Sequence, residues 1–373
     1  MTATNILRRL HSEHGQSPWI DNLRRGYLTS GQLQGLVDRG VRGLTSNPTI
    51  FQKAIQGSSE YDAQFEALAR QGLGVEQIYW ELVLDDIAGA LSVFRPLYEL
   101  SNGTDGFVSV EVDPGLATDG EATLVAARAL HERIDAPNVM IKIPATREGL
   151  PAIRTMIAEG RNVNVTLIFS LERYADVIEA YVAGLEDRLA AGHNDLSTVN
   201  SVASFFISRV DSEVDDRLAH SEDEAARELS GRAAIAQGHL AYGLFLERFS
   251  GDRWQRLKSR GAKVQRPLWA STSTKNPAYP DTLYVDTLIG PDTVNTLPDQ
   301  TLEAFDDHGT VARTVDTSLT EARATWNRLA EVGIDMADVA AKLEADGVAS
   351  FQKSFVELLD ALRVKLGSGS AAG

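Results

Sequence analysis

Short apolar, β-branched runs recur along the chain, and stretches with helical periodicity lie between them. In residues 76–100 and 171–190, apolar positions recur at three- and four-residue spacing, which is typical of amphipathic helices. Regular alternation of strands and helices predicts βα units with a parallel sheet. The expected strands are 17–21, 40–47, 107–112, 139–144, 162–169, 201–210, 266–273 and 282–290.

Eight such strands predict an α/β fold of the (β/α)8 TIM-barrel type. A doubly wound open sheet is the alternative, although that fold usually has fewer strands and carries a glycine fingerprint after the first one. A plain barrel takes about 250 residues, and the chain has 373. We place the surplus in a helix around Ile6–Leu10, a helical insertion from about Glu213 to Lys263, and C-terminal helices within 317–333 and 350–366. We expect one domain over residues 1–366, with 367–373 (GSGSAAG) as a flexible tail by composition.

Composition and charge narrow the possible functions. The chain has no cysteine, which excludes disulfides, thiol nucleophiles and thiolate metal ligands. A net charge of −16 argues against nucleic acid as the main partner, because such binding depends on clustered Lys and Arg. The N-terminus lacks a secretory signal and no segment is apolar enough to span a bilayer, so we expect a cytoplasmic protein without a membrane partner. Monomer and homodimer both stay open.

Common catalytic signatures are absent from the sequence. It contains no glycine-rich nucleotide loop, no HExxH and no GxSxG. His11 and His14 share an expected helix, but two histidines without a carboxylate cluster make a weak metal site, so no metal is expected.

In a parallel barrel, the chemistry lies at the carboxyl ends of the strands. Lys142 stands out there, because it lies between Ile141 and Ile143 on a strand that otherwise reads as buried. The polar residues at these strand ends are Asp21, Asn47, Glu111, Lys142, Asn164, Thr166, Ser204, Arg209, Ser273 and Lys275. Two acids, amides, hydroxyls and cations suit carbonyl chemistry on a polyhydroxylated phosphate ester.

Several of these residues have ordinary structural explanations. Asp21 could cap the next helix, and Asn47 before Pro48 is a common turn signal. Arg209 could pair with a nearby acid such as Asp211, and Lys142 could simply pair with Glu111 inside the barrel. It is their conjunction that favours catalysis.

The segments GLTSNPTIF, VSVEVDPGL, VMIKIPATREGLPAI, NVNVTLIFS and SFFISRVDSEVD resemble those of transaldolases, in the same order along the barrel. The resemblance covers most of residues 15–310 and is greatest to the longer actinobacterial and cyanobacterial members. It implies that Lys142 is the Schiff-base lysine and that Asp21 and Glu111 are the acid/base pair. Thr166 would help to hold a catalytic water.

The resemblance also implies which residues bind the substrate: Asn47, Asn164 and Ser204 for the dihydroxyacetone portion, and Arg209 for the phosphate. Where shorter members have a Ser-Phe-Arg-Asn run, this chain has STKN, which places Ser273 and Lys275 at the phosphate. A lysine binds phosphate as a point charge rather than as a fork, so this assignment departs from the family pattern. Phe206 would keep the pocket dry or would serve only as core packing.

The implied reaction is ping-pong transfer of dihydroxyacetone, with sedoheptulose 7-phosphate and glyceraldehyde 3-phosphate as substrates and erythrose 4-phosphate and fructose 6-phosphate as products, in the pentose phosphate pathway. Because the iminium takes the place of a Lewis acid, no cofactor is expected. Two alternatives stay open: a Schiff-base aldolase that releases free dihydroxyacetone, and a sugar-phosphate binding barrel without catalysis.

Overall fold

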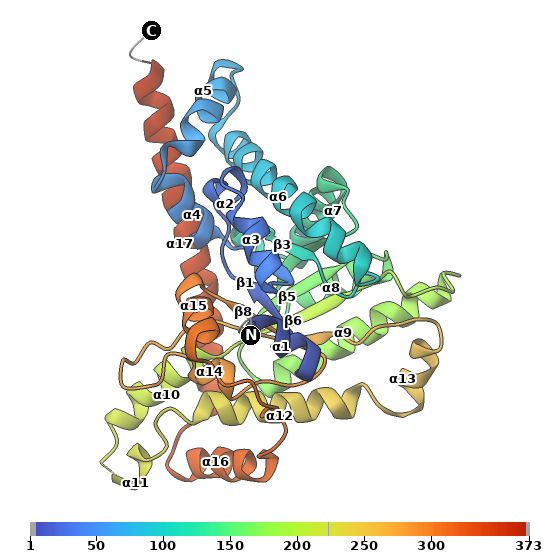
Figure 1. The fold of residues 1–373 in the computed structure, drawn as a ribbon, viewed down its shortest axis with the longest axis vertical. Coiled ribbons are helices and arrows are strands. Elements are labelled where there is room, and N and C mark those ends of the chain that lie inside the picture. Colours follow the sequence, from blue (N-terminus) through green and yellow to red (C-terminus); the bar gives the residue numbers. More distant parts are fainter. Residues whose placement is uncertain (1–4, 223, 371–373) are drawn as a thin grey trace.

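The computed structural model describes residues 5–222 and 224–370. Within these residues, eight parallel strands close into a barrel in sequence order, and helices surround it (Figure 1). The strands are β1 (Gln16–Ile20), β2 (Gly43–Thr45), β3 (Phe107–Glu111), β4 (Val139–Pro144), β5 (Val163–Ile168), β6 (Ser201–Phe206), β7 (Arg266–Ala270) and β8 (Thr293–Leu297). Since β1 pairs with β8, the predicted (β/α)8 barrel is confirmed and the open sheet is excluded.

Helices connect successive strands and cover the outside of the barrel. In the first half of the chain they are α1 (Ile6–His14), α2 (Arg25–Thr29), α3 (Gln32–Arg39), α4 (Pro48–Gln56), η1 (Ser59–Tyr61), α5 (Asp62–Arg70), α6 (Val75–Leu100), η2 (Pro114–Leu116), α7 (Gly120–Ile134), α8 (Gly149–Ala158) and α9 (Leu171–Ala190). They continue with α10 (Ser208–Ala219), α11 (Glu224–Arg227), α12 (Ala233–Arg248), α13 (Gly251–Lys258), α14 (Leu283–Asp286), α15 (Asp299–His308), α16 (Leu319–Glu331) and α17 (Met336–Ser370). The core between strands and helices contains large, fully buried rings, among them Trp19, Phe205 and Trp269.

The extra helices lie where the sequence predicts them. α1 precedes the barrel, α10 to α13 form the insertion between β6 and β7, and α16 and α17 follow at the C-terminus. Figure 1 shows α17, in red, running alongside α4, and α17 also packs on α6 and α10. Because α17 continues to Ser370, residues 367–370 of the expected tail are helical. Residues 371–373 lie outside the described part, so the flexibility of the tail stays a prediction.

The eighth predicted strand is wrong. Residues 282–290 contain the short helix α14 instead, and Thr282 Oγ1 donates a hydrogen bond to Asp286 Oδ2 (2.7 Å) there. The eighth strand of the barrel is β8, which pairs with β1. The apolar run TLYVDTLIG is buried as a connecting segment, so its composition imitates a strand. β8, in contrast, has the sequence TVNTL. Because its buried positions include the polar residues Thr293 and Asn295, it lacks the apolar run that predicts a buried strand.

The sixth predicted strand, 201–210, is too long. β6 ends at Phe206 and α10 begins at Ser208, so Arg209 lies in the first turn of a helix. The apolar residues Ile207 and Val210, both buried, extend the strand-like composition into that helix.

The register of β3, β4 and β5 positions the polar residues inside the barrel. Glu111 pairs with Lys142, and Lys142 pairs with Asn164, so the three residues form one row across neighbouring strands. Thr166 lies further along β5, opposite Pro144, where the β5–β6 register shifts and Leu167 has a φ of 60°. Such an irregularity changes the direction of side chains at a strand end and is common beside active sites.

Candidate active site

A cavity of about 350 Å³ opens at the carboxyl ends of the strands, and α4, α10 and α17 also contribute to its walls. Most of the predicted site residues line it: Asp21, Asn47, Lys142, Thr166, Ser204, Phe206, Arg209, Ser273 and Lys275. The other two, Glu111 and Asn164, lie directly behind this lining, where they contact Lys142 and Ser204 respectively. The structure thus brings the whole predicted set together.

Lys142 lies deep in this cavity and is 4% exposed. Its Nζ is 3.3 Å from Glu111 Oε2 and donates a hydrogen bond to the backbone oxygen of Ser46 (3.2 Å). The pairing with Glu111 that the sequence suggested is therefore present. Because Nζ also borders the cavity, the same amine is accessible to a carbonyl bound there.

Glu111 and Thr166 have unsatisfied polar atoms. Neither carboxylate oxygen of Glu111 nor the hydroxyl of Thr166 has a hydrogen-bond partner within the described residues, although all three atoms are buried. Burial raises the pKa of Glu111, and the charge of Lys142 opposes that rise only in part. Buried polar atoms of this kind require a partner from a water or a ligand.

Asp21 follows β1 and borders the opposite side of the cavity. Its Oδ1 accepts a hydrogen bond from Thr45 Oγ1 (2.7 Å), and that hydroxyl also lies 2.6 Å from Thr296 Oγ1. Burial raises the pKa of Asp21, while the Lys142 charge and the Thr45 hydrogen bond lower it. Asp21 is not the cap of α2, whose N-cap is Arg24, so the helix-capping explanation is wrong.

Hydrogen bonds fix the orientation of both amides and of Ser204. Asn164 donates from Nδ2 to Ser109 Oγ (3.0 Å), and its Oδ1 accepts from Ser204 Oγ (2.7 Å). Asn47 caps α4 by accepting from the backbone N–H of Ile50 (3.0 Å), so its structural explanation is confirmed although it also lines the cavity.

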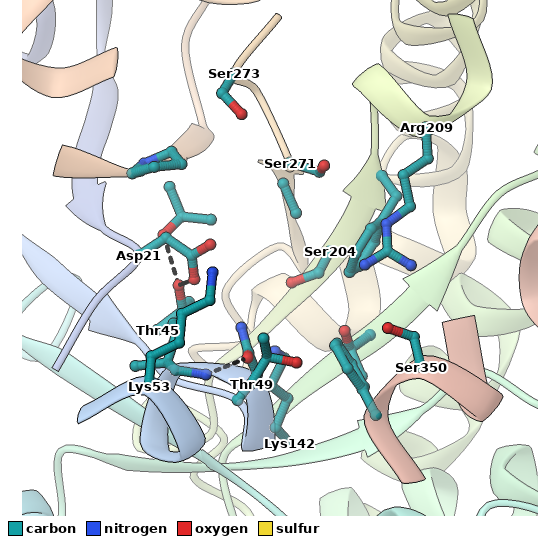
Figure 2. A pocket seen from close by; sticks show the side chains of 18 of the residues that line it. Asp21, Thr45, Thr49, Lys53, Lys142, Ser204, Arg209, Ser271, Ser273 and Ser350 are labelled. Atoms are coloured by element: carbon teal, nitrogen blue, oxygen red, sulfur yellow. Dashed lines mark hydrogen bonds between the residues drawn. The ribbon is translucent and has the colours of Figure 1, made fainter. Parts of the chain in front are cut away.

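Three cationic side chains border the cavity in addition to Lys142: Lys53 from α4, Arg209 from α10 and Lys275 after β7. Figure 2 shows Lys53 and Arg209 pointing into this space. Lys53 and Arg209 form no ion pair within the described residues. The suggested pairing of Arg209 with Asp211 is wrong, because Asp211 instead accepts hydrogen bonds from Ala234 N and Tyr284 Oη. Burial lowers the pKa of Lys275, and the charges of Arg209 and Lys53 lower it further. Uncompensated cations close enough to influence one another favour an anionic ligand.

Aromatic rings surround Arg209. Its Cζ lies 5.2 Å from the ring centre of Phe206 and 6.0 Å from that of Phe351, a residue of α17. Both phenylalanines line the cavity. Phe206 also packs on Phe169, at 5.2 Å between ring centres, so its core-packing and site roles coincide.

Sequence reasoning missed several lining residues, among them Thr45, Lys53, Thr296 and Phe351. Thr45 and Lys53 flank the Ser-Asn-Pro segment, and their order along β2 and α4 could have indicated them. Thr296 was missed because β8 was assigned to the wrong segment. Phe351 lies on a helix far along the chain, and no sequence pattern connects it to the barrel.

A family model described as transaldolase/fructose-6-phosphate aldolase matches residues 18–362. The chain belongs to this family. Similarity to named members extends over almost the whole length. A transaldolase of Parafrankia sp. (strain EAN1pec) is 52% identical over 362 residues, 96% of this chain and 98% of its own.

Two further relatives extend the comparison with this family. A transaldolase of Thermobifida fusca (strain YX) is 51% identical over 357 residues, 95% of this chain and 97% of its own. One from Mycobacterium tuberculosis (strain ATCC 25618 / H37Rv) is 48% identical over 369 residues, 98% of this chain and 99% of its own. The family resemblance seen in the sequence, including its actinobacterial character, is confirmed.

Proposed function

We propose that this chain is a transaldolase that moves a dihydroxyacetone unit from a ketose phosphate to an aldose phosphate through a Schiff base on Lys142. The observation that carries the proposal is a buried amine that borders an anion-binding cavity and lies 3.3 Å from a carboxylate without other partners. Membership of the transaldolase/fructose-6-phosphate aldolase family and about 50% identity to named transaldolases support the same reaction, that of a transferase.

In the first step, the uncharged amine of Lys142 attacks the C2 carbonyl of the ketose phosphate. The carbinolamine then loses water to give an iminium. Glu111 lies 3.3 Å from Lys142 Nζ, and the unsatisfied oxygens of Glu111 and Thr166 are consistent with one water held between these two residues. Through this water, Glu111 moves the protons that carbinolamine formation and dehydration require.

In the second step, Asp21 removes the proton of the C4 hydroxyl. The C3–C4 bond breaks, its electron pair enters the iminium, and a dihydroxyacetone enamine stays on Lys142 while the aldose phosphate leaves. The hydrogen bond from Thr45 orients the Asp21 carboxylate for this proton transfer. Asn47, Asn164 and Ser204 hold the hydroxyls of the three-carbon unit.

In the third step, an acceptor aldose phosphate enters and its aldehyde carbon bonds to the enamine. Asp21 returns its proton to the new C4 hydroxyl, and water then releases the ketose phosphate from Lys142. The reaction is therefore ping-pong.

Arg209 and Lys275, with Ser273, bind the phosphate of each substrate. Lys275 Nζ donates to Ser273 Oγ (2.6 Å), which places both groups at the same side of the cavity. Lys53 adds a third cation at this end. Lys275 binds phosphate as a point charge and lacks the bidentate recognition that an arginine at this position would supply.

The substrates we propose are sedoheptulose 7-phosphate and glyceraldehyde 3-phosphate, which give erythrose 4-phosphate and fructose 6-phosphate in the pentose phosphate pathway. The direct test is to incubate the protein with the first pair and to identify the products by mass spectrometry. Formation of both products supports the transfer reaction. Free dihydroxyacetone from fructose 6-phosphate without an acceptor, in amounts equal to turnover, would indicate an aldolase; binding without turnover would indicate a binding barrel.

We further propose that residues 1–366 act as one catalytic domain in the cytoplasm, as a monomer or a homodimer. Support comes from the family model, which spans 18–362. Among the described residues, no helix is both long and apolar enough to cross a membrane.

A further inference from the structure

Phe351 is the residue through which the C-terminal helix α17 reaches the candidate active site. It is 4% exposed and lines the cavity, although it follows the last barrel strand by more than one helix. Its ring contacts both functional ends of the site: the ring centre lies 5.7 Å from Lys142 Nζ and 6.0 Å from Arg209 Cζ. One aromatic side chain therefore covers the reacting amine and the cation at the phosphate end.

Two hydrogen bonds from residues just after Phe351 fix the position of α17 over the barrel. Gln352 donates from Nε2 to the backbone oxygen of Pro114 (3.2 Å) after β3. Ser354 Oγ lies 2.8 Å from Thr49 Oγ1 on α4. Because these bonds lie within three residues of Phe351, the ring is held over the cavity rather than being free to leave it.

Gly347, one turn before Phe351, permits the close approach of α17. A Cβ at this position would lie 3.0 Å from Leu167 Cδ2 and 3.6 Å from Arg209 Nη1. A side chain there would require the Leu167 side chain to move by a few tenths of an ångström, while its contact with Arg209 would be an ordinary van der Waals one. A glycine inside a helix is unfavourable on its own, so its presence at this contact indicates that closeness to the barrel matters more.

From this geometry, we propose that Phe351 determines whether the enamine on Lys142 is transferred or released. The inference rests on the proposed function and adds a specificity-determining residue to it. In transfer, the enamine carbon bonds to the aldehyde carbon of the acceptor, and the new hydroxyl takes its proton from Asp21. In release, the enamine carbon takes a proton instead, water adds to the iminium carbon, and breakage of the C–N bond frees dihydroxyacetone and the amine.

Release needs a proton donor and an additional water at the enamine, and an apolar ring over Lys142 hinders access of both. The unsatisfied oxygens of Glu111 and Thr166 can hold the one water that imine chemistry requires. Phe351 thus excludes bulk water without removing the bound one.

The test compares Phe351→Ala and Phe351→Leu with Phe355→Ala, one turn further along α17. Phe355 is also buried and packs on Tyr79, at 5.0 Å between ring centres, but it does not line the cavity. Release is measured as free dihydroxyacetone from fructose 6-phosphate alone. Transfer is measured as sedoheptulose 7-phosphate formed from fructose 6-phosphate and erythrose 4-phosphate.

We expect Phe351→Ala to raise the ratio of release to transfer about tenfold, because loss of the ring admits water and a proton donor to the enamine. Phe351→Leu keeps apolar cover and should raise it less, while Phe355→Ala should leave the wild-type ratio. A ratio unchanged in Phe351→Ala, or changed equally in Phe355→Ala, overturns the inference. If Phe351→Ala does not fold, Phe351→Leu decides alone: a raised ratio supports the inference and an unchanged one overturns it. If the wild-type protein gives no borohydride-stable adduct on Lys142, the proposed function itself fails and the inference fails with it.

Discussion

Two buried carboxylates at opposite ends of the barrel have very different surroundings. Asp105, before β3, lies at the amino end, where it accepts from Arg42 Nε (2.6 Å) and Ser17 Oγ (3.0 Å) and pairs with Arg266 (3.2 Å). Glu111, at the end of the same strand, has one cation at 3.3 Å and no hydrogen-bond partner within the described residues.

The difference in partners produces opposite shifts in pKa. Burial would raise the pKa of Asp105, but the charges of Arg266 and Arg42 hold it below its usual value. Burial raises the pKa of Glu111, and Lys142 offsets this only in part. A fully satisfied charge stabilises a fold, whereas an unsatisfied one is available to exchange protons. Burial of a charge therefore does not itself indicate function, whereas a lack of hydrogen-bond partners does.

The largest expected effect at the mouth of the barrel comes from Lys142→Ala. Without the amine no imine forms, so kcat for transfer should fall by about three orders of magnitude or more. The fold should persist, because Glu111 can take up a proton once its cation is gone. Steady-state kinetics and circular dichroism check both statements. A loss below about tenfold would contradict the covalent mechanism.

Glu111→Gln removes the acid/base group but keeps its shape. We expect kcat to fall about a hundredfold, within the range for loss of a general acid/base. The free energy of unfolding should also fall, by about 3 kcal/mol, because the change breaks the buried ion pair between Glu111 and Lys142. Urea denaturation and kinetics on the same preparation measure the two quantities.

The same isosteric change at the other end, Asp105→Asn, should lower the free energy of unfolding without lowering kcat. It leaves two guanidinium groups without their counter-ion and should cost about 3 kcal/mol of unfolding free energy, with kcat of the folded protein unchanged. Because the pKa of Asp105 is lowered, its stabilising effect is present above the usual aspartate range and is lost as the pH falls through the lowered value. The difference in unfolding free energy between the wild-type protein and Asp105→Asn should therefore shrink below about pH 4. Equal effects of both amide substitutions on kcat would remove the contrast between the two ends.

Removing cations from the phosphate end should affect substrate binding more than chemistry. Arg209→Ala should raise KM for phosphorylated substrates about tenfold or more, as expected for a charge-assisted hydrogen bond, and should alter KM for unphosphorylated sugars little. Lys53 is exposed, so Lys53→Ala should raise KM for phosphorylated substrates only a few-fold. The control is Lys353→Ala on α17, which should change neither KM value. The Lys353 side chain is exposed and pairs with Glu357 at 3.9 Å. Indifference of KM to Arg209→Ala would remove it from the phosphate site.

The smallest expected effect is a shift of the pH profile through Thr45. Asp21 must be ionised to accept the C4 proton, so activity should fall as the pH drops through its raised pKa. The Thr45 hydrogen bond lowers that pKa, hence Thr45→Val should move the acid limb of kcat to higher pH. Thr45→Ser keeps the hydroxyl and should leave the limb in place. An acid limb that is the same in both variants would show that another group controls it.

The sequence predicts correctly the position of site residues that lie on regular barrel strands. Lys142, Glu111 and Asn164 could be placed together because parallel strands in register align their residues at one end of the barrel. β8 was not predicted correctly, because polar residues fill that end of the barrel and an apolar run imitates a strand nearby. Phe351 could not be found, since its position depends on how α17 packs on the barrel, which no local pattern encodes.

The Schiff-base role of Lys142 is tested most directly by trapping the covalent intermediate. The protein is reduced with borohydride in the presence of fructose 6-phosphate, and its peptides are mapped by mass spectrometry. We predict a dihydroxyacetone-sized adduct on Lys142 and on no other lysine. The absence of an adduct, or an adduct on a different lysine, would return Lys142 to the role of a paired core residue and would contradict the Schiff-base account.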